Sequence, residues 1–164
     1  MNLHSSLVLQ GETSEIWTPD VELWNLDVGL KDSFEDAYAR VTNDGVVLWS
    51  RPGHLKPTCK FAGLDSFPFD KTTCTMEFGS WRFSGKYMRM ELLGDGFSIG
   101  GSETAGARYA EYTLAETDPV TVEKYVYPPF LGSPSEDWPV LLYNVTIARS
   151  WQPYARGYIA TQST

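Results

Sequence analysis

Short segments of alternating apolar and polar residues, separated by Gly, Pro, Asn and Asp, run along the whole 164-residue chain. This pattern constrains the fold more than any other feature. A period of two places every second side chain on one face of a β-strand, and no apolar repeat of 3.6 residues continues beyond about two helical turns. Six Trp, nine Tyr and eight Phe also suit a pleated, half-buried surface. We therefore expect a single all-β domain.

Ten segments are expected to form strands. The Asp-Gly pair within Thr42–Val46 is the clearest hairpin signal, because these residues tolerate the positive φ angles of a tight turn. In the last segment the odd-numbered residues from Leu141 to Ile147 are apolar or aromatic and share one face. The other face carries Leu142, Asn144 and Thr146, so one face should be buried and one wet. The ten segments are Ser6–Gln10, Val21–Leu26, Ala37–Thr42, Val46–Ser50, Lys60–Leu64, Cys74–Trp81, Tyr87–Leu93, Ala110–Ala115, Val120–Tyr127 and Leu141–Ala148.

Charge and motif content argue against several classes of function. The formal net charge of −8 repels phosphate backbones, so we expect no nucleic-acid partner. His4 and His54 have no Cys or acidic partners at metal-ligand spacing, and no Gly-x-Ser-x-Gly elbow occurs. No apolar run approaches the roughly 18 residues that a membrane span needs, and the N-terminal residues lack the pattern of a signal peptide. We expect neither an enzyme nor a metal or cofactor site.

The only two cysteines, Cys59 and Cys74, bracket the stretch "CKFAGLDSFPFDKTTC" with fourteen residues between them. Two cysteines this close, flanking turn residues, indicate a disulfide and hence an oxidising compartment, and their spacing excludes a CxxC-type zinc or redox site. The alternative is two unrelated buried thiols.

Four stretches, in the same order along the chain, resemble the extracellular domain of Cys-loop pentameric ligand-gated ion channels. They are "SEIWTPDVELWN" (Ser14–Asn25), the bracketed loop with "FPFD", "CTMEFGSWRFSG" (Cys74–Gly85) and "LLYNVTIARSWQPY" (Leu141–Tyr154). The resemblance covers about Leu7 to Tyr154. It implies an immunoglobulin-like β-sandwich on the extracellular side of a cell membrane, joined to a transmembrane domain. Five copies, identical or different, would form a ring with ligand sites between neighbours.

The resemblance also implies a ligand site built from aromatic side chains. The matching positions are Trp24, Trp81, either Tyr125 or Tyr127, and Trp138. The two tyrosines lie on the same side of one expected strand, Val120–Tyr127, so the sequence leaves open which of them contacts the ligand. Aromatic faces attract an ammonium group, so an amine-like ligand is expected. The segment "GVVLWS" matches a strand on the neighbouring subunit's face, with Leu48 and Ser50 directed at the ligand.

A second implied site couples ligand binding to the channel gate. By resemblance its residues are Phe67, Pro68, Phe69 and Asp70 at the tip of the bracketed loop, with Arg149 at the end of the last strand. The family signature assigns Trp17 to the core and Pro19 to a turn. Independently, "NVT" at Asn144 is an N-glycosylation sequon, which requires a secreted, exposed site.

The chain also departs from the family. The bracketed loop is one residue longer than is usual in animal members, and "YVYPPFLGSPSEDW" lacks the adjacent cysteine pair of acetylcholine-type subunits. Arg82 follows Trp81 and should point to the opposite side of the strand. A helix and two strands expected before the Trp-x-Pro-Asp segment have no counterpart, so we expect an N-terminally incomplete binding domain over residues 1–154 and a tail over 155–164. The alternatives are a soluble binder like acetylcholine-binding protein and an adhesion or carbohydrate-binding sandwich.

Overall fold

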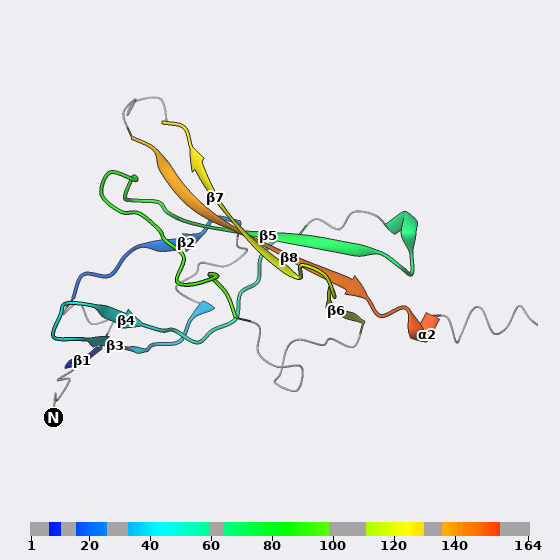
Figure 1. Ribbon diagram of the computed structural model, residues 1–164, viewed down its shortest axis with the longest axis horizontal. Coiled ribbons are helices and arrows are strands. Elements are labelled where there is room, and N and C mark those ends of the chain that lie inside the picture. Colours follow the sequence, from blue (N-terminus) through cyan, green and yellow to red (C-terminus); the bar gives the residue numbers. More distant parts are fainter. Residues whose placement is uncertain are drawn as a thin grey trace, which may run out of the picture.

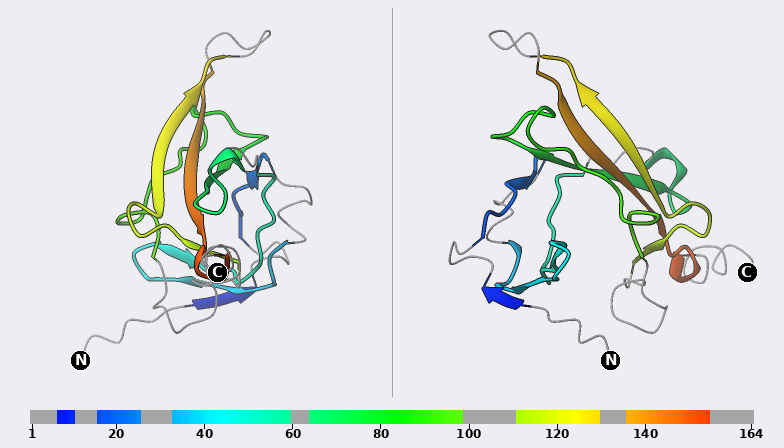
Figure 2. Two further views of the ribbon diagram at one scale, coloured as in Figure 1. Left: turned by 90° about the vertical axis from the view of Figure 1, so that its right-hand side faces the viewer. Right: turned by 60° about the vertical axis from the view of Figure 1, so that its left-hand side comes forward.

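Two antiparallel sheets form the layers of a β-sandwich (Figure 1). The computed structural model describes residues 7–10, 16–25, 33–59, 64–98, 111–129 and 136–154. The smaller sheet has the order β1 (Leu7–Gln10), β3 (Tyr38–Val41), β4 (Val47–Trp49). The larger has the order β2 (Val21–Leu23), β5 (Lys71–Ser80), β8 (Trp138–Arg149), β6 (Tyr112–Leu114), and β7 (Val120–Tyr127) also pairs with β8. Two short helical turns, η1 (Leu64–Ser66) and α2 (Gln152–Tyr154), complete the described elements. The all-β prediction is confirmed, and Figure 2 shows the smaller sheet below the larger one.

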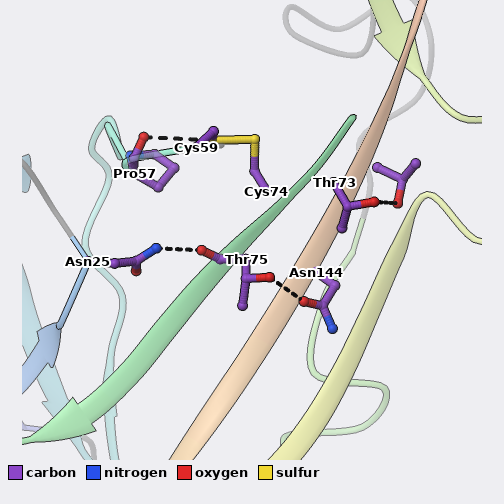
Figure 3. Close-up of a disulfide and its surroundings, with 8 residues drawn as sticks. Asn25, Pro57, Cys59, Thr73, Cys74, Thr75 and Asn144 are labelled. Carbon is purple, nitrogen blue, oxygen red and sulfur yellow. Dashed lines mark hydrogen bonds between the residues drawn. A yellow bond between two sulfur atoms is a disulfide. The ribbon is translucent and has the colours of Figure 1, made fainter. Parts of the chain in front are cut away.

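The long pair β5 and β8 forms the centre of the larger sheet, and its register separates two faces. Leu141 lies opposite Phe78, Tyr143 opposite Met76 and Val145 opposite Cys74, which makes one apolar face. The other face carries Thr73, Thr75, Asn144 and Thr146, and we call it the polar face. Its hydroxyl groups bond across the strands, at 3.0 Å between Thr73 and Thr146 and at 2.7 Å from Thr75 Oγ1 to Asn144 Oδ1 (Figure 3). The predicted division of β8 into two chemically different faces is therefore confirmed.

The polar face is not wet throughout, which corrects the simpler expectation for β8. Val140 belongs to this face, yet only 1% of it is exposed. Its partner in the register is Gly79, and the ring of Trp24 lies against Gly79. The Trp24 side chain, which follows β2, thus lies over the Gly79 end of the polar face, whose other end carries threonines.

The predicted hairpin at Thr42–Val46 is confirmed. The amide of Thr42 donates to the carbonyl of Val46 at 2.9 Å, and Gly45 N donates to Thr42 O at 3.0 Å. Gly45 has φ +87°, a conformation that side chains with a Cβ rarely adopt. Asp44 accepts a hydrogen bond from the Thr42 hydroxyl, which fixes the turn that joins β3 to β4.

One expected strand does not form, and another lies mostly outside the described residues. Tyr87–Leu93 contains no strand, because the amides of Tyr87 and Met88 both turn back to Ser84 O, at 2.9 and 3.0 Å. An alternating sequence pattern alone does not make a strand, because the backbone N–H and C=O groups also need hydrogen-bonding partners on a neighbouring strand. For Lys60–Leu64, residues 60–63 lie outside the described residues and Leu64 begins η1.

Trp17 is not a core residue, contrary to the expectation from the resemblance. It is 66% exposed and contacts the ring of Phe83 edge-on, with centroids 5.9 Å apart. The segment precedes β2, which pairs only with β5 among the described strands, so little structure is available to cover it. Pro19 is exposed in the same connection, and residues 17–20 form no regular turn.

Candidate ligand-binding site

The predicted aromatic residues meet at one end of the polar face. In the register, Tyr125 lies opposite Val140 and Tyr127 opposite Trp138, so both tyrosines belong to the same face as the threonines of β5. Trp81 directly follows β5 with the same parity. Trp24 follows β2 and is held there by its amide, which donates to Glu77 O at 2.8 Å. We call the group the aromatic cluster: Trp24, Trp81, Tyr125, Tyr127 and Trp138.

Four rings of the aromatic cluster pack directly on one another, and Trp138 belongs to the cluster by its register position opposite Tyr127. Trp24 stacks against Trp81 with centroids 4.9 Å apart and against Tyr127 at 5.4 Å, and Tyr125 contacts Tyr127 edge-on at 4.8 Å. Offset stacking and edge-on contact are the favourable geometries for such pairs. Trp81 remains 61% exposed and Tyr125 46% exposed. The cluster therefore presents open aromatic surface to its surroundings.

A glycine determines where Trp24 lies. A Cβ at Gly79 would lie 2.8 Å from Trp24 Cζ2 and 2.8 Å from Val140 Cγ1, which is closer than carbon atoms can approach. The absent side chain at Gly79 thus lets the indole lie flat on the strand. This contact connects the "ELWN" segment to the "FGSW" segment in space.

Glu77 is a residue of the site that the sequence reasoning missed. Its carboxylate accepts a hydrogen bond from the Tyr127 hydroxyl, and this contact raises the pKa of Tyr127 to about 12, because ionisation would place two negative charges together. Glu77 lies opposite Leu142 on the polar face, and β8 separates it from Tyr127 in the sheet. The alternation of side chains along β5 places Glu77 on the same face as Trp81. This was the signal from which the sequence could have indicated Glu77 as a residue of the site.

Arg82 does not join the aromatic cluster among the contacts of the described residues. Its amide donates to Asp20 Oδ2 at 2.8 Å, and Asp20 Oδ1 accepts from the Ser80 hydroxyl at 2.5 Å. The Asp of the Trp-x-Pro-Asp segment therefore caps the end of β5 next to Trp81. Arg82 is exposed and lies beyond the end of β5.

The predicted neighbour-facing residues belong to the other sheet. Leu48 lies within β4 and Ser50 follows it, and the two share one side of the strand by parity. Leu48 is 59% exposed and Ser50 is also exposed. Both side chains are accessible to a second molecule.

The predicted coupling residues meet at the other end of β8. Arg149 Nε donates to Asp70 Oδ1 at 2.7 Å and Arg149 Nη2 to Asp70 Oδ2 at 3.2 Å. The guanidinium also bonds Glu111 and the hydroxyl of Tyr112, and Tyr154 OH lies 3.4 Å from Nη1. This arrangement lowers the pKa of the Asp70 carboxyl and raises that of Arg149, because each charge is hydrogen-bonded to its opposite.

Aromatic rings surround this ion pair. The guanidinium carbon of Arg149 lies 5.1 Å from the ring centroid of Phe67 and 4.6 Å from that of Tyr112, within cation-π range. Phe67 and Phe69 are nevertheless 50% and 60% exposed. Pro68 connects them through a cis peptide bond. The tip of the bracketed loop thus combines a fixed charged base with exposed apolar side chains.

The predicted disulfide between Cys59 and Cys74 is confirmed, with Cα atoms 5.0 Å apart (Figure 3). It attaches the start of the bracketed loop to β5. The described residues include no group of three or more His, Cys, Asp or Glu that could hold a metal ion. No helix within those residues is long and apolar enough to cross a membrane.

An antiparallel β-sandwich with a disulfide-closed loop at one end and an exposed aromatic cluster at the other defines a ligand-binding domain. The chain belongs to the neurotransmitter-gated ion-channel ligand-binding domain family, whose model matches residues 2–151. This is the extracellular ligand-binding domain of Cys-loop receptors, a binding family rather than an enzyme family.

Relatives of this chain include several acetylcholine receptor subunits. It is 38% identical over 92 residues to acetylcholine receptor subunit alpha-type acr-7 of Caenorhabditis elegans, covering 54% of this chain and 17% of that protein. It is 24% identical over 146 residues to subunit alpha-L1 of Schistocerca gregaria, covering 85% of this chain and 26% of that protein. It is 34% identical over 85 residues to human neuronal subunit alpha-3, covering 52% and 17%. The chain thus spans about a quarter or less of these relatives.

Proposed function

We propose that this domain binds a small amine-like ligand at the aromatic cluster, between subunits of a pentameric channel on the extracellular side of a cell membrane. The observation that carries the proposal is the stacked group of Trp24, Trp81 and Tyr127, in which Trp81 is exposed, with the Glu77 carboxylate at its edge. Aromatic faces attract an ammonium group at roughly 0.5 to 2 kcal/mol each. The negative charge of the nearby Glu77 carboxylate also attracts the ammonium group.

The ligand's cation would contact open ring faces rather than the space between stacked rings. Centroid separations of 4.9 and 5.4 Å leave no room for an ammonium group between Trp24 and its neighbours. Trp81 and Tyr125 carry most of the exposed ring surface. These two residues are therefore the first contacts in the proposal, and Trp138 and Tyr127 form the wall behind them.

A neighbouring subunit would complete the site. Leu48 of β4 and Ser50, which follows β4, are both exposed and are the proposed contribution of that subunit. The ring would hold five such subunits, identical or different. Several relatives are acetylcholine receptor subunits, which favours an amine among small ligands.

The opposite end of the domain is the proposed contact with a transmembrane domain. Phe67 and Phe69 are exposed at the tip of the bracketed loop, and the buried pair of Asp70 and Arg149 holds that tip against β8. Movement of β7 and β8 at the aromatic cluster would reach the tip through the same strand β8. This continuity is the physical basis for coupling binding to gating.

Tryptophan fluorescence tests the binding proposal. The chain is titrated with choline and with its uncharged isostere 3,3-dimethyl-1-butanol. The protein concentrations are ones at which light scattering has established the number of subunits in the assembly. We expect choline to bind roughly tenfold or more tightly, because only the cation gains from the ring faces. Equal binding of the two compounds would contradict the proposal.

Trp81→Ala should remove most of the difference between the two compounds. Trp17→Ala is the matched control, since Trp17 is 66% exposed and Trp81 61%, but Trp17 contacts only Phe83 among the described rings. If both variants lost the difference in affinity between the two compounds equally, the aromatic cluster would not be the binding site.

A further inference from the structure

We propose that Asn144 carries an N-linked glycan that extends over the polar face of the larger sheet. Asn144-Val145-Thr146 is the only Asn-x-Ser/Thr sequence in the chain. Both polar residues of this sequence lie on the polar face, and Val145 lies on the apolar face opposite Cys74. The inference is independent of the proposed ligand site.

The hydrogen bonding of Asn144 leaves the acceptor nitrogen available. Its Oδ1 accepts from the Thr75 hydroxyl at 2.7 Å, and Nδ2 is directed away from that bond (Figure 3). Glycosylation replaces one hydrogen on Nδ2 and leaves Oδ1 unchanged. The folded sheet can therefore keep its bond between Thr75 and Asn144 after modification.

The surroundings of Asn144 have room for a sugar. Its two partners in the register are Thr75 on β5 and Thr121 on β7, and Thr73 lies one pleat further along β5. All three threonines are exposed and short. The aromatic cluster begins near Val140, about 13 Å away along β8 at roughly 3.3 Å per residue. A glycan on Asn144 would thus leave the cluster accessible.

The disulfide indicates the cellular compartment that N-glycosylation requires. Cys74 immediately precedes Thr75, so the disulfide and the sequon lie on opposite faces of one strand pair. Disulfides persist in the oxidising secretory pathway, where N-glycosylation also occurs. There a transferase forms the bond between Nδ2 and C1 of a lipid-linked oligosaccharide pyrophosphate. The bond from C1 to the phosphate oxygen breaks, Nδ2 loses a proton, and lipid pyrophosphate leaves.

The position has a consequence for assembly. A branched sugar on Asn144 would keep the part of the polar face around Thr75 and Thr121 in solvent, so a neighbouring subunit would not pack there. Contacts between subunits would then use the aromatic cluster at the other end of that face and exposed apolar side chains of the smaller sheet such as Val8 and Leu48.

The test is secretion of the chain from animal cells followed by intact mass and peptide N-glycosidase treatment in H₂¹⁸O. We expect the secreted, disulfide-bonded chain to lose the mass of one glycan, and we expect the ¹⁸O label at position 144 as aspartate. Secreted chain with an intact disulfide and no glycan mass would overturn the proposal.

Variants distinguish the effect of losing the sequon from the effect of losing the hydroxyl hydrogen bonds around it. Asn144→Gln and Thr146→Ala should abolish the glycan, whereas Thr146→Ser should retain it. Thr73→Ala is the matched control, because it removes the 3.0 Å bond to Thr146 but keeps the sequon. Retention of the glycan in Thr146→Ala would contradict the assignment, and if a variant is not secreted, the labelled wild-type peptide still decides.

Discussion

Arg149 and Asp70 form a doubly hydrogen-bonded ion pair whose side chains are only 7% and 1% exposed. The pair joins the last residue of β8 to the end of the bracketed loop, 79 residues earlier in the chain. A buried charge without its partner is costly, so each residue depends on the other. This contact attaches the loop tip to β8, together with the ring contacts of Phe67 with Tyr154 and of Phe69 with Trp151.

Asp70→Asn should destabilise the domain strongly at neutral pH, because it leaves the Arg149 charge buried with less compensation. We expect the Tm to fall by roughly 5 °C or more in thermal unfolding at pH 7. Asp95→Asn, at an exposed carboxylate in a loop, is the control and should change little. Equal effects would show that the ion pair is not the cause.

The same pair predicts a pH dependence. The folded-state pKa of Asp70 lies below the ordinary value of 3.8, so its contribution is present above about that pH and is lost as pH falls through the lower folded value. The wild-type free energy of unfolding should therefore decline below about pH 4. In Asp70→Asn this part of the decline should be absent.

Removing the disulfide should lower the free energy of unfolding by about 3 kcal/mol in the chain-entropy description of a loop of this length. The measurement is denaturant unfolding of the double variant Cys59→Ser, Cys74→Ser. Wild type in reducing agent should approach the variant, and the variant itself should not respond to the reductant. A variant as stable as the oxidised wild type would contradict the prediction.

Glu77→Gln should lower the pKa of Tyr127 from about 12 toward the ordinary value of 10.0, since the neighbouring negative charge is removed. The readout is phenolate absorbance in alkaline titration, taken as the difference from Tyr127→Phe. Because the folded pKa is raised, the contact stabilises the fold below about pH 10, and this stability is lost as pH rises toward 12.

The same variant tests the electrostatic part of the ligand proposal. Glu77→Gln should weaken choline binding by roughly 1.5- to 5-fold, as expected for a partly exposed charge, and should leave 3,3-dimethyl-1-butanol unaffected. Weakening of both compounds to the same extent would indicate a change of shape rather than of charge.

The 164-residue chain alone should self-associate in solution. Val8, Val47 and Leu48 of the smaller sheet are 50% or more exposed, and β7 has a free edge among the described strands. Exposed strand edges and apolar patches recruit further chains. Light scattering after size exclusion should report a mass above that of a monomer.

A matched pair of variants locates that association. Leu48→Glu should shift the chain toward monomer, because it places a charge on the smaller sheet. Leu93→Glu, at a 90% exposed position in a loop, should not. A wild-type chain that remains monomeric with a sharp thermal transition would show that the sandwich needs no partner.

The sequence by itself determined the strands that have a strong period of two and the side chains that share their faces. Val120–Tyr127 was predicted to the residue, and the common face of Tyr125 and Tyr127 followed from parity. The Asp-Gly hairpin and the disulfide were also readable, because turn chemistry and cysteine spacing are local properties. Where alternation had no neighbouring strand to pair with, as in Tyr87–Leu93, the same local signal was wrong.

Only the tertiary structure decided which residues from distant segments meet. Trp24 covers Gly79, Tyr127 bonds Glu77, and Arg149 binds Glu111 as well as Asp70. The partners of these three hydrogen-bonded pairs are 38 to 79 residues apart in the chain. Strand order and register create these contacts, since they determine which strands are neighbours and how far each is shifted. Local periodicity gives the face of a side chain but not the strand beside it, so the carboxylate at the aromatic cluster became visible only in the folded sheet.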